Sequence, residues 1–347
     1  MRLNRAHPLY IQDLDHILRT WNLSLLVGKH VLITGATGLL GVCLIDALMR
    51  LNDQGGNIMI YAVGRNRDRA LGRLGLYFGH PCFHFLEQDV QDELSQSLKV
   101  DYVIPCASNS HPLAYSRFPV ETMLVNLKGA EHALNKAVEI GATVLYPSTV
   151  EVYGNARSDD FFTEDYTGQL NLSTARSCYT ESKRACEALC QSYIAEKGVD
   201  VRIVRLSRVF GPTMLESDTK ASSQFILNAL RGEDIVLKSE GNQYFSYTYV
   251  ADAVSAMLYV LLNGKSGVPY NVSNENCNVH LKDFAAFCAE ASGKKVVFDL
   301  PSETEKDGYS IAQRAIMDNT RLRAIGWEPV YPIKEAVWRT IQILQSP

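Results

Sequence analysis

The stretch that decides the fold is His30-Val-Leu-Ile-Thr34 followed by Gly35-Ala-Thr-Gly38-Leu-Leu-Gly41. The first five residues are largely apolar and β-branched, which predicts a buried strand. The next seven have the spacing GxxGxxG and lead into VCLIDALMRL, a segment long enough for a helix. Such glycines allow a tight turn, a close approach of the backbone to a pyrophosphate, and close packing of helix on strand. The turn therefore predicts a dinucleotide site, with these contact residues: Gly35, Thr37, Gly38, Leu39, Leu40 and Gly41.

Short apolar runs alternate with helical segments on both sides of this turn. The expected strands are 30–34, 57–63, 84–88, 102–106, 143–146 and 201–206. Apolar strands joined by helical crossovers indicate an α/β fold: a Rossmann-type doubly wound parallel sheet covered on both faces. The regularity weakens after Gly211-Pro212, which predicts a smaller C-terminal substrate-binding lobe.

We expect three parts along the chain. Residues 1–28 form an N-terminal helical extension, because Leu9, Leu14 and Ile17 recur at helical spacing. We expect it to pack on the main body and assign it no chemistry. Residues 29–207 form the dinucleotide-binding domain, to which 249–275 return. Residues 208–248 and 276–347 form the nucleotide-sugar-binding lobe.

Composition narrows the function classes. The 347 residues are 46% hydrophobic with a net charge of −4, and this mild acidity argues against nucleic-acid binding. There is no apolar run of about 18 residues to span a membrane, and Asp13 and Asp15 interrupt any signal peptide. The eight cysteines form no CxxC pair, so we expect no metal site and a reducing, cytoplasmic environment.

The catalytic residues are expected in PSTVEVYG, at 147–154, and SCYTESKR, at 177–184. Tyr179 and Lys183 are four residues apart, so they share a helix face. A tyrosine ionises near 10, but a neighbouring ammonium and a cationic nicotinamide favour the phenolate; a drop of about three units corresponds to about 4 kcal/mol. Thr149 can hydrogen-bond to the same substrate hydroxyl. This combination predicts a tyrosine general base.

The cofactor type is left open by the residues around the second strand. That strand ends at Gly64-Arg65, where an NAD site usually has an acid and where an arginine suits the 2′-phosphate of NADP. Alternatively, Arg65 stacks on the adenine or is solvated. Asp89 and Val90, after the third strand, are placed to contact the adenine.

Around these motifs, over roughly residues 29–345, the chain resembles the extended short-chain dehydrogenase/reductase family of nucleotide-sugar epimerases and dehydratases. Within it, the chain is most similar to the UDP-glucuronate decarboxylases. The stretches that carry the resemblance are STVEVYG at 148–154, SCYTESKR at 177–184, GWEP at 326–329, ASNSHPLAY at 107–115, VNLKG at 125–129, and Ser222–Phe225.

The resemblance implies a role for each matching residue. Tyr179 is implied as the base at the sugar C4 hydroxyl, Lys183 as its electrostatic partner, Thr149 as the holder of that hydroxyl, and Glu151 as the acidic group near C5. Further cofactor contacts are implied for Ala107, Ser108, Asn126 and Lys183. Substrate contacts are implied for Ser108, Tyr115, Glu151, Arg208, Lys220 and Arg314.

Three positions depart from the family pattern. Val150 stands where dehydratases usually have an aspartate, which argues against elimination of water at C6. Phe245 stands where an arginine commonly faces the nucleotide diphosphate. Arg208 stands where the decarboxylases have asparagine, so we hypothesise that it supplies the missing positive charge. Lys220 lies in the following loop, which is placed to cover a nucleotide.

We therefore expect an enzyme that decarboxylates UDP-glucuronate, or a similar nucleotide uronate, through a 4-keto intermediate. Because this cycle begins with an oxidation, it favours NAD, and NADP is the alternative raised by Arg65. The other readings are a 4-epimerase, a 4,6-dehydratase, an NADPH-dependent reductase and a non-catalytic dinucleotide sensor. The resemblance also implies a homodimer through helices near 115–138 and 179–197, where Leu189 and Tyr193 add apolar surface.

Overall fold

A seven-stranded parallel sheet forms the centre of the computed structural model, which describes residues 3–19, 23–94, 98–156, 161–300 and 312–345. The strand order is β10-β6-β5-β4-β1-β2-β3. The strands are β1 (His30–Thr34), β2 (Met59–Gly64), β3 (Phe83–Glu87), β4 (Tyr102–Pro105), β5 (Thr143–Thr149), β6 (Val201–Leu206) and β10 (Pro269–Val272). This sheet confirms the predicted doubly wound α/β fold.

Some strand boundaries differ from those predicted. The strand expected at 57–63 begins only at Met59, because Asn57 has a left-handed backbone with φ of 48°, which a strand residue does not adopt. The strand expected at 143–146 continues to Thr149. Ser148 and Thr149 therefore form the carboxyl end of β5, which lies between β6 and β4 in the sheet.

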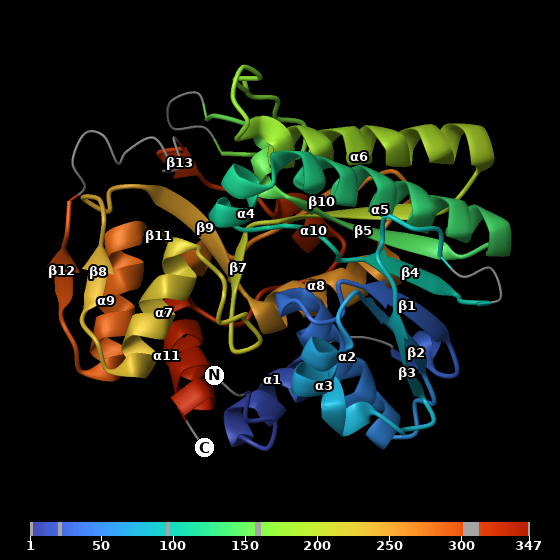
Figure 1. Cartoon of the computed structure of the whole chain (residues 1–347), viewed down its shortest axis with the longest axis horizontal. Helices are drawn as coiled ribbons and strands as arrows, with labels where there is room; N and C mark the ends of the chain where they lie inside the picture. Colours follow the sequence, from blue (N-terminus) through green and yellow to red (C-terminus); the bar gives the residue numbers. More distant parts are fainter. Residues whose placement is uncertain (1–2, 20–22, 95–97, 157–160, 301–311, 346–347) are drawn as a thin grey trace.

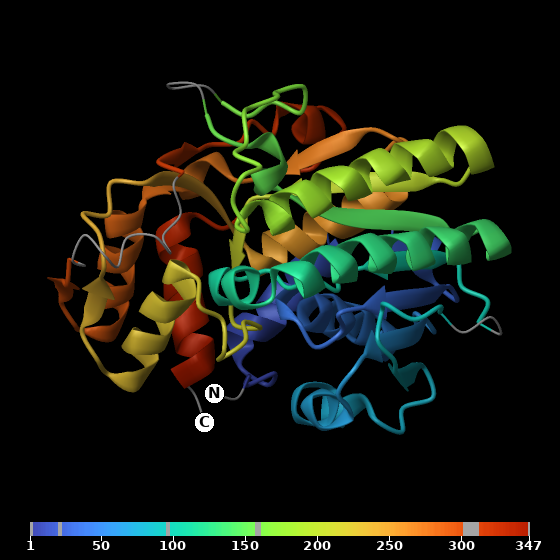
Figure 2. The ribbon, with the colours of Figure 1, turned by 45° about the horizontal axis from the view of Figure 1, so that its top comes forward.

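Helices cover both faces of this sheet (Figure 1). On one face lie α5 (Pro119–Ile140), preceded by α4 (Pro112–Arg117), and α6 (Ser177–Lys197). On the other lie α2 (Leu39–Asp53), α8 (Val250–Asn263) and, beside α2, α3 (Arg67–Leu74). The turned view in Figure 2 shows α5 and α6 running side by side along the sheet. Within the described part of the chain, no helix combines the length and apolarity needed to cross a bilayer.

The N-terminal segment packs on the main body, as expected. It forms α1 (Pro8–Arg19) and a 3-10 turn, η1 (Leu23–Leu26), while residues 1–2 and 20–22 of the expected extension lie outside the described residues. Tyr10 donates a hydrogen bond to Asp46 of α2 at 2.6 Å, and Asp13 pairs with Arg339 at 2.7 Å. The extension is thus held both by α2, the first helix after it in the sequence, and by a residue near the C-terminus.

Two smaller sheets lie beyond one end of the central sheet (Figures 1 and 2). In the first, β9 (Tyr244–Tyr249) pairs with β7 (Arg208–Phe210), β11 (Asn278–His280) and β13 (Arg314–Ala315); the second consists of β8 (Ile235–Leu237) and β12 (Val296–Phe298). The remaining helices are α7 (Ala221–Arg231), α9 (Leu281–Ser292), α10 (Thr320–Ala324) and α11 (Ile333–Gln345). The remaining 3-10 turns are η2 (Gly75–Tyr77), η3 (Val150–Tyr153) and η4 (Glu275–Cys277).

The central sheet leads directly into the smaller one at Ser207. This residue is the only one between β6 and β7, and its hydroxyl hydrogen-bonds to that of Thr248 on β9 at 2.6 Å. Arg208 therefore lies at the junction of the two sheets, next in the sequence to the carboxyl end of a central strand. In open α/β sheets, ligands bind beyond the carboxyl ends of the strands.

Candidate active site

The glycine turn is packed too closely for side chains. Gly35 has φ of 62°, and a Cβ on it would lie 2.6 Å from the backbone nitrogen of Ala107, after β4. A Cβ on Gly41 would lie 2.5 Å from the carbonyl oxygen of Gly35. Helix α2 begins after Gly38 with no side chain capping its first turn. The N–H groups of that turn are therefore available to a phosphate, as a dinucleotide requires.

Two buried polar atoms, one just after β4 and one on α5, fit a bound cofactor. Ser108 Oγ and Asn126 Oδ1 are buried and have no hydrogen-bond partner among the described residues. The Asn126 amide nitrogen donates to Ser182 Oγ at 2.8 Å, which joins α5 to α6. Buried acceptors and hydroxyls normally have partners, so the residues present fit a dinucleotide that reaches from the turn toward α6.

Arg65 is paired with two carboxylates. Its Nη1 lies 2.9 Å from Glu121 Oε1 and 3.6 Å from Asp89 Oδ2. Glu121 and Asp89 would repel a second phosphate at this position, so the argument for NADP from Arg65 alone is weakened. Val90, next to Asp89, is buried and packs close to Gly129 of α5.

Tyr179 lies in a cluster built from four elements, β5, η3, α4 and α6. Thr149 ends β5, and its Oγ1 accepts a hydrogen bond from the backbone N–H of Glu151 at 3.3 Å. Tyr179 is buried on the first turn of α6, and its ring stacks on that of Tyr115 from α4, with centroids 4.8 Å apart. The predicted residues Thr149, Glu151, Tyr115 and Tyr179 are thus brought together.

Arg176, which the sequence analysis did not single out, adds positive charge near Tyr179. Burial raises the pKa of Tyr179 to about 12, while a hydrogen bond with Thr149 and the charge of Arg176 act to lower it. Lys183 is also buried, which lowers its pKa. Its Nζ donates to the carbonyl of Pro147 at 2.9 Å and lies 4.9 Å from the ring centroid of Tyr146.

Arg176 is a site residue that the sequence analysis missed. Its guanidinium carbon lies 4.7 Å from the centroid of Tyr115, and its Nη2 lies 3.7 Å from Glu151 Oε2. The available signal was its position three residues before Tyr179; the structure places it at the N-cap of α6. That position alone does not show which carboxylate or ring it meets.

Arg208 approaches the same carboxylate from the smaller sheet. Its Nη2 lies 3.9 Å from Glu151 Oε1, and its guanidinium carbon lies 3.6 Å from the ring centroid of Phe245. Phe245 and Arg208 both depart from the family pattern, and here the ring of Phe245 provides an aromatic surface for the guanidinium of Arg208. Glu151, Arg208, Asn155 and Ala315 line one small pocket.

The contacts of the two remaining predicted substrate residues are with other described side chains. Arg314 packs over Tyr244 and Phe161, at 5.2 and 5.5 Å from their centroids. Lys220 pairs with Asp218 at 3.3 Å. The adjacent Thr219 hydroxyl hydrogen-bonds to His111 at 3.2 Å, so this loop lies against the 107–115 segment.

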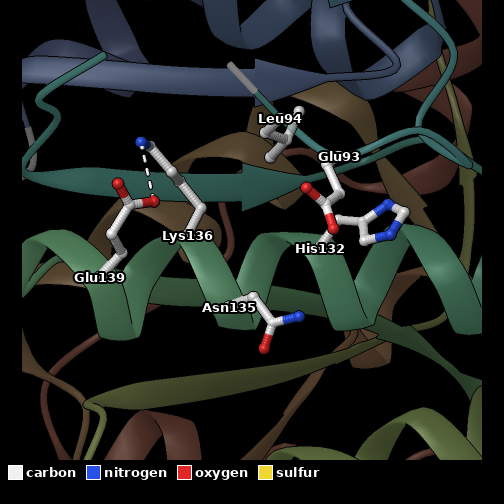
Figure 3. A pocket seen from close by; sticks show the side chains of 6 residues that line it. All are labelled: Glu93, Leu94, His132, Asn135, Lys136 and Glu139. Atoms are coloured by element: carbon white, nitrogen blue, oxygen red, sulfur yellow. Dashed lines mark hydrogen bonds and ion pairs between the residues drawn. The ribbon is translucent and has the colours of Figure 1, made fainter. Parts of the chain in front are cut away.

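A separate pocket on α5 carries none of the predicted site residues (Figure 3). Its lining is Glu93, Leu94, His132, Asn135, Lys136 and Glu139. The ammonium of Lys136 pairs with Glu139 at 3.2 Å (Figure 3). Across the described ranges, no group of three histidine, cysteine or acidic residues is arranged to hold a metal. The cluster around Tyr179 and Glu151 is therefore the candidate active site.

Comparison with known proteins decides the family. The model of the NAD dependent epimerase/dehydratase family matches residues 31–273. The chain belongs to this family. The match contains the glycine turn, Thr149, Glu151, Tyr179 and Arg208, and it confirms both the resemblance and the expected NAD dependence.

Curated relatives are similar over most of the chain. UDP-glucuronic acid decarboxylase 1 of Xenopus tropicalis is 32% identical over 319 residues, covering 92% of this chain and 72% of the relative. UDP-glucuronic acid decarboxylase 6 of Arabidopsis thaliana is 31% identical over 310 residues, covering 89% of this chain and 86% of the relative.

Solved structures share the fold. The UDP-glucuronic acid 4-epimerase of Bacillus cereus, in complex with UDP-glucuronic acid and NAD, has a TM-score of 0.77 at 18% identity, covering 91% of this chain and 98% of the other. The dTDP-glucose 4,6-dehydratase of Bacillus anthracis, in complex with NAD, has a TM-score of 0.76 at 19% identity, covering 91% and 96%.

Proposed function

We propose that this protein is an NAD-dependent decarboxylase of UDP-glucuronate or a similar nucleotide uronate. The observation that carries the proposal is the position of Glu151, which lies beside Thr149 and within 4 Å of two arginines, Arg176 and Arg208. The site therefore combines groups for chemistry at C4 with a charged pair suited to C5 and its carboxylate. The names of the similar decarboxylases support the same chemistry.

In this proposal Tyr179 acts at the C4 hydroxyl. Thr149 holds that hydroxyl, and Tyr179 accepts its proton. Bound NAD supplies the group that takes a hydride from C4 and returns it at the end of the cycle. Because burial raises the pKa of Tyr179, the phenolate depends on compensating positive charge, which Arg176 and the oxidised nicotinamide provide.

The resulting C4 ketone is β to the C5 carboxylate. When the C5–C6 bond breaks, its electron pair moves toward the ketone and carbon dioxide leaves. Glu151 is placed to manage the proton that C5 then receives, and Tyr179 returns its proton to the C4 oxygen. Each residue contributes by positioning and acid–base transfer.

A panel of nucleotide sugars distinguishes this function from its rivals. NAD-loaded protein is incubated with UDP-glucuronate, UDP-glucose and dTDP-glucose, and the products are analysed by mass spectrometry. We expect loss of carbon dioxide from UDP-glucuronate. Loss of water would identify a 4,6-dehydratase, an unchanged mass with inverted C4 a 4-epimerase, and no product from any sugar the non-catalytic sensor.

The cofactor has its own test. Arg65 is already paired with Glu121 and Asp89, so we propose that it lies at the adenine end of NAD without a 2′-phosphate. Denatured protein should release NAD. Release of NADP would favour the reductase reading.

We also propose a homodimer formed through α5 and α6. Large apolar side chains are exposed along α4, α5 and the junction between them: Leu113, Phe118, Val120, Met123, Leu124 and Val138. Exposed apolar side chains on neighbouring elements are typical of an interface. We further propose that the chain is divided into a dinucleotide-binding domain and a substrate lobe, with the bounds expected from the sequence. The cytoplasmic location and the absence of a nucleic-acid partner stay predictions.

A further inference from the structure

We infer that Arg208 selects the carboxylate of the sugar, and not the diphosphate of the nucleotide. This inference rests on the proposed function, because it assumes that the substrate is a nucleotide sugar whose C4 lies at Tyr179. It replaces the hypothesis drawn from the sequence, in which Arg208 neutralises the diphosphate.

The guanidinium of Arg208 is held in place but is incompletely paired. Its flat face lies over Phe245, with the guanidinium carbon 3.6 Å from the ring centroid. Its Nη2 is 3.9 Å from Glu151, which is longer than a hydrogen bond. Its Nη1 is buried and has no hydrogen-bond partner among the described residues. Neither of these two nitrogens makes a hydrogen bond to the described residues, so the guanidinium retains donors for a planar anion, which a carboxylate matches in bidentate geometry.

The charges around Glu151 leave a positive excess. Arg176 and Arg208 both lie within 4 Å of this single carboxylate. One negative charge therefore faces two positive charges in a half-buried pocket. A sugar that carries a carboxylate supplies the second negative charge, so that each guanidinium has a counter-charge. A neutral hexose leaves one guanidinium without a counter-charge.

The order of groups along the sugar ring places Arg208 near C5. In a pyranose, C5 adjoins C4, while C1, which carries the diphosphate, lies across the ring from C4. Thr149 is assigned to C4, and its Oγ1 is bonded to the backbone of Glu151. Arg208 lines the same pocket as Glu151. Because Glu151 is assigned to C5 in the proposed function, the contacts from Thr149 through Glu151 to Arg208 lead to the C5 substituent and away from the diphosphate.

Three ligands separate these two roles. Binding of UDP-glucuronate, UDP-glucose and UDP is measured by calorimetry on NAD-loaded protein in a Tyr179→Phe background, which blocks turnover. Arg208→Gln should weaken UDP-glucuronate about tenfold or more, as expected for a lost charge-assisted hydrogen bond. The affinities for UDP-glucose and UDP should stay within about threefold, because neither ligand carries the carboxylate. Arg208→Lys, which keeps the charge but not the planar fork, should give an intermediate loss for UDP-glucuronate alone.

The control is Arg323→Gln, which removes the same charge at an exposed arginine paired with Glu275 and Glu328. It should leave all three affinities unchanged. NAD content and the thermal unfolding midpoint show whether each variant is folded. Equal weakening of all three ligands by Arg208→Gln would assign the residue to the diphosphate and overturn the inference. Unchanged affinity for UDP-glucuronate, or no binding of it before substitution, would overturn it as well.

This result is separate from the test of the proposed function. If the enzyme decarboxylates UDP-glucuronate but Arg208→Gln weakens all three ligands equally, the function stands and the inference fails. If no carbon dioxide is lost but the weakening is confined to UDP-glucuronate, Arg208 still selects a uronate and the chemistry at the site is different.

Discussion

The ring of Tyr115 stacks on the ring of Tyr179, with centroids 4.8 Å apart and planes inclined by 22°. Arg176 lies 4.7 Å from the centroid of Tyr115 and also approaches Glu151. Tyr179, which would act at C4, and Glu151, which would act near C5, are therefore linked by contacts through Tyr115 and Arg176. A change at Arg176 should be felt both by the base and by the carboxylate.

Tyr179→Phe should fold, bind NAD and lose nearly all turnover. The substitution removes the hydroxyl that accepts the C4 proton but keeps the ring that stacks on Tyr115. Loss of a general base typically costs about a hundredfold or more. Steady-state rates with UDP-glucuronate, together with NAD content, provide the measurement. A rate within a few fold of the unsubstituted enzyme would remove Tyr179 from this role.

Arg176→Gln should move the acidic limb of the pH–rate profile to higher pH. Arg176 lowers the pKa of Tyr179, so removing its charge raises that pKa, and a higher pH is then needed to form the phenolate. We expect a shift of roughly half to one pH unit, because the side chain is partly solvated. Arg176→Lys, which keeps the positive charge, should bring the acidic limb most of the way back to its original pH. An unchanged limb would show that Arg176 does not act on the base.

Gly41→Ala should weaken NAD binding. The added Cβ would lie 2.5 Å from the carbonyl oxygen of Gly35, so the turn must move. Forcing an extra carbon into a packed site costs about 1–3 kcal/mol, which corresponds to a loss of affinity of about 5- to 150-fold. Gly72→Ala on α3 is the matched control, since its Cβ meets nothing within 4 Å. Equal NAD affinity in the two variants would contradict the role assigned to the turn.

The purified protein should have a solution mass near twice 38.7 kDa. The double variant Val120→Glu/Leu124→Glu should be monomeric, because it places charges on the exposed apolar surface of α5. Leu76→Glu, at an exposed leucine of η2, should stay dimeric. Light scattering measures all three. A monomer before substitution, or a dimer that survives both charges, would rule out this interface.

The parts of the site that could be predicted from the sequence are local. A strand, a glycine turn and a helix follow one another within 30–53, so the cofactor-binding turn could be predicted from consecutive residues. Spacing also placed Tyr179 and Lys183 on one face of α6. It could not show that Lys183 reaches back to the carbonyl of Pro147, because a long side chain has several directions available on the same face.

The parts that could not be predicted depend on contacts between distant elements. Arg208 meets Phe245 because β7 pairs with β9, and nothing near Arg208 in the sequence indicates that pairing. Likewise, Arg176 meets Glu151 only because the N-terminus of α6 is brought against η3. The sequence identified two departures from the family pattern at Arg208 and Phe245, and the structure shows that they are in contact.

The most direct test of the proposed chemistry is turnover of UDP-glucuronate by NAD-loaded protein in deuterium oxide, with the product analysed by mass spectrometry and NMR. The proposed cycle predicts a UDP-pentose that has lost one carbon dioxide and carries one non-exchangeable deuterium at C5, with no net reduction of the cofactor. A product that keeps its carboxylate, or stoichiometric accumulation of NADH, would contradict it.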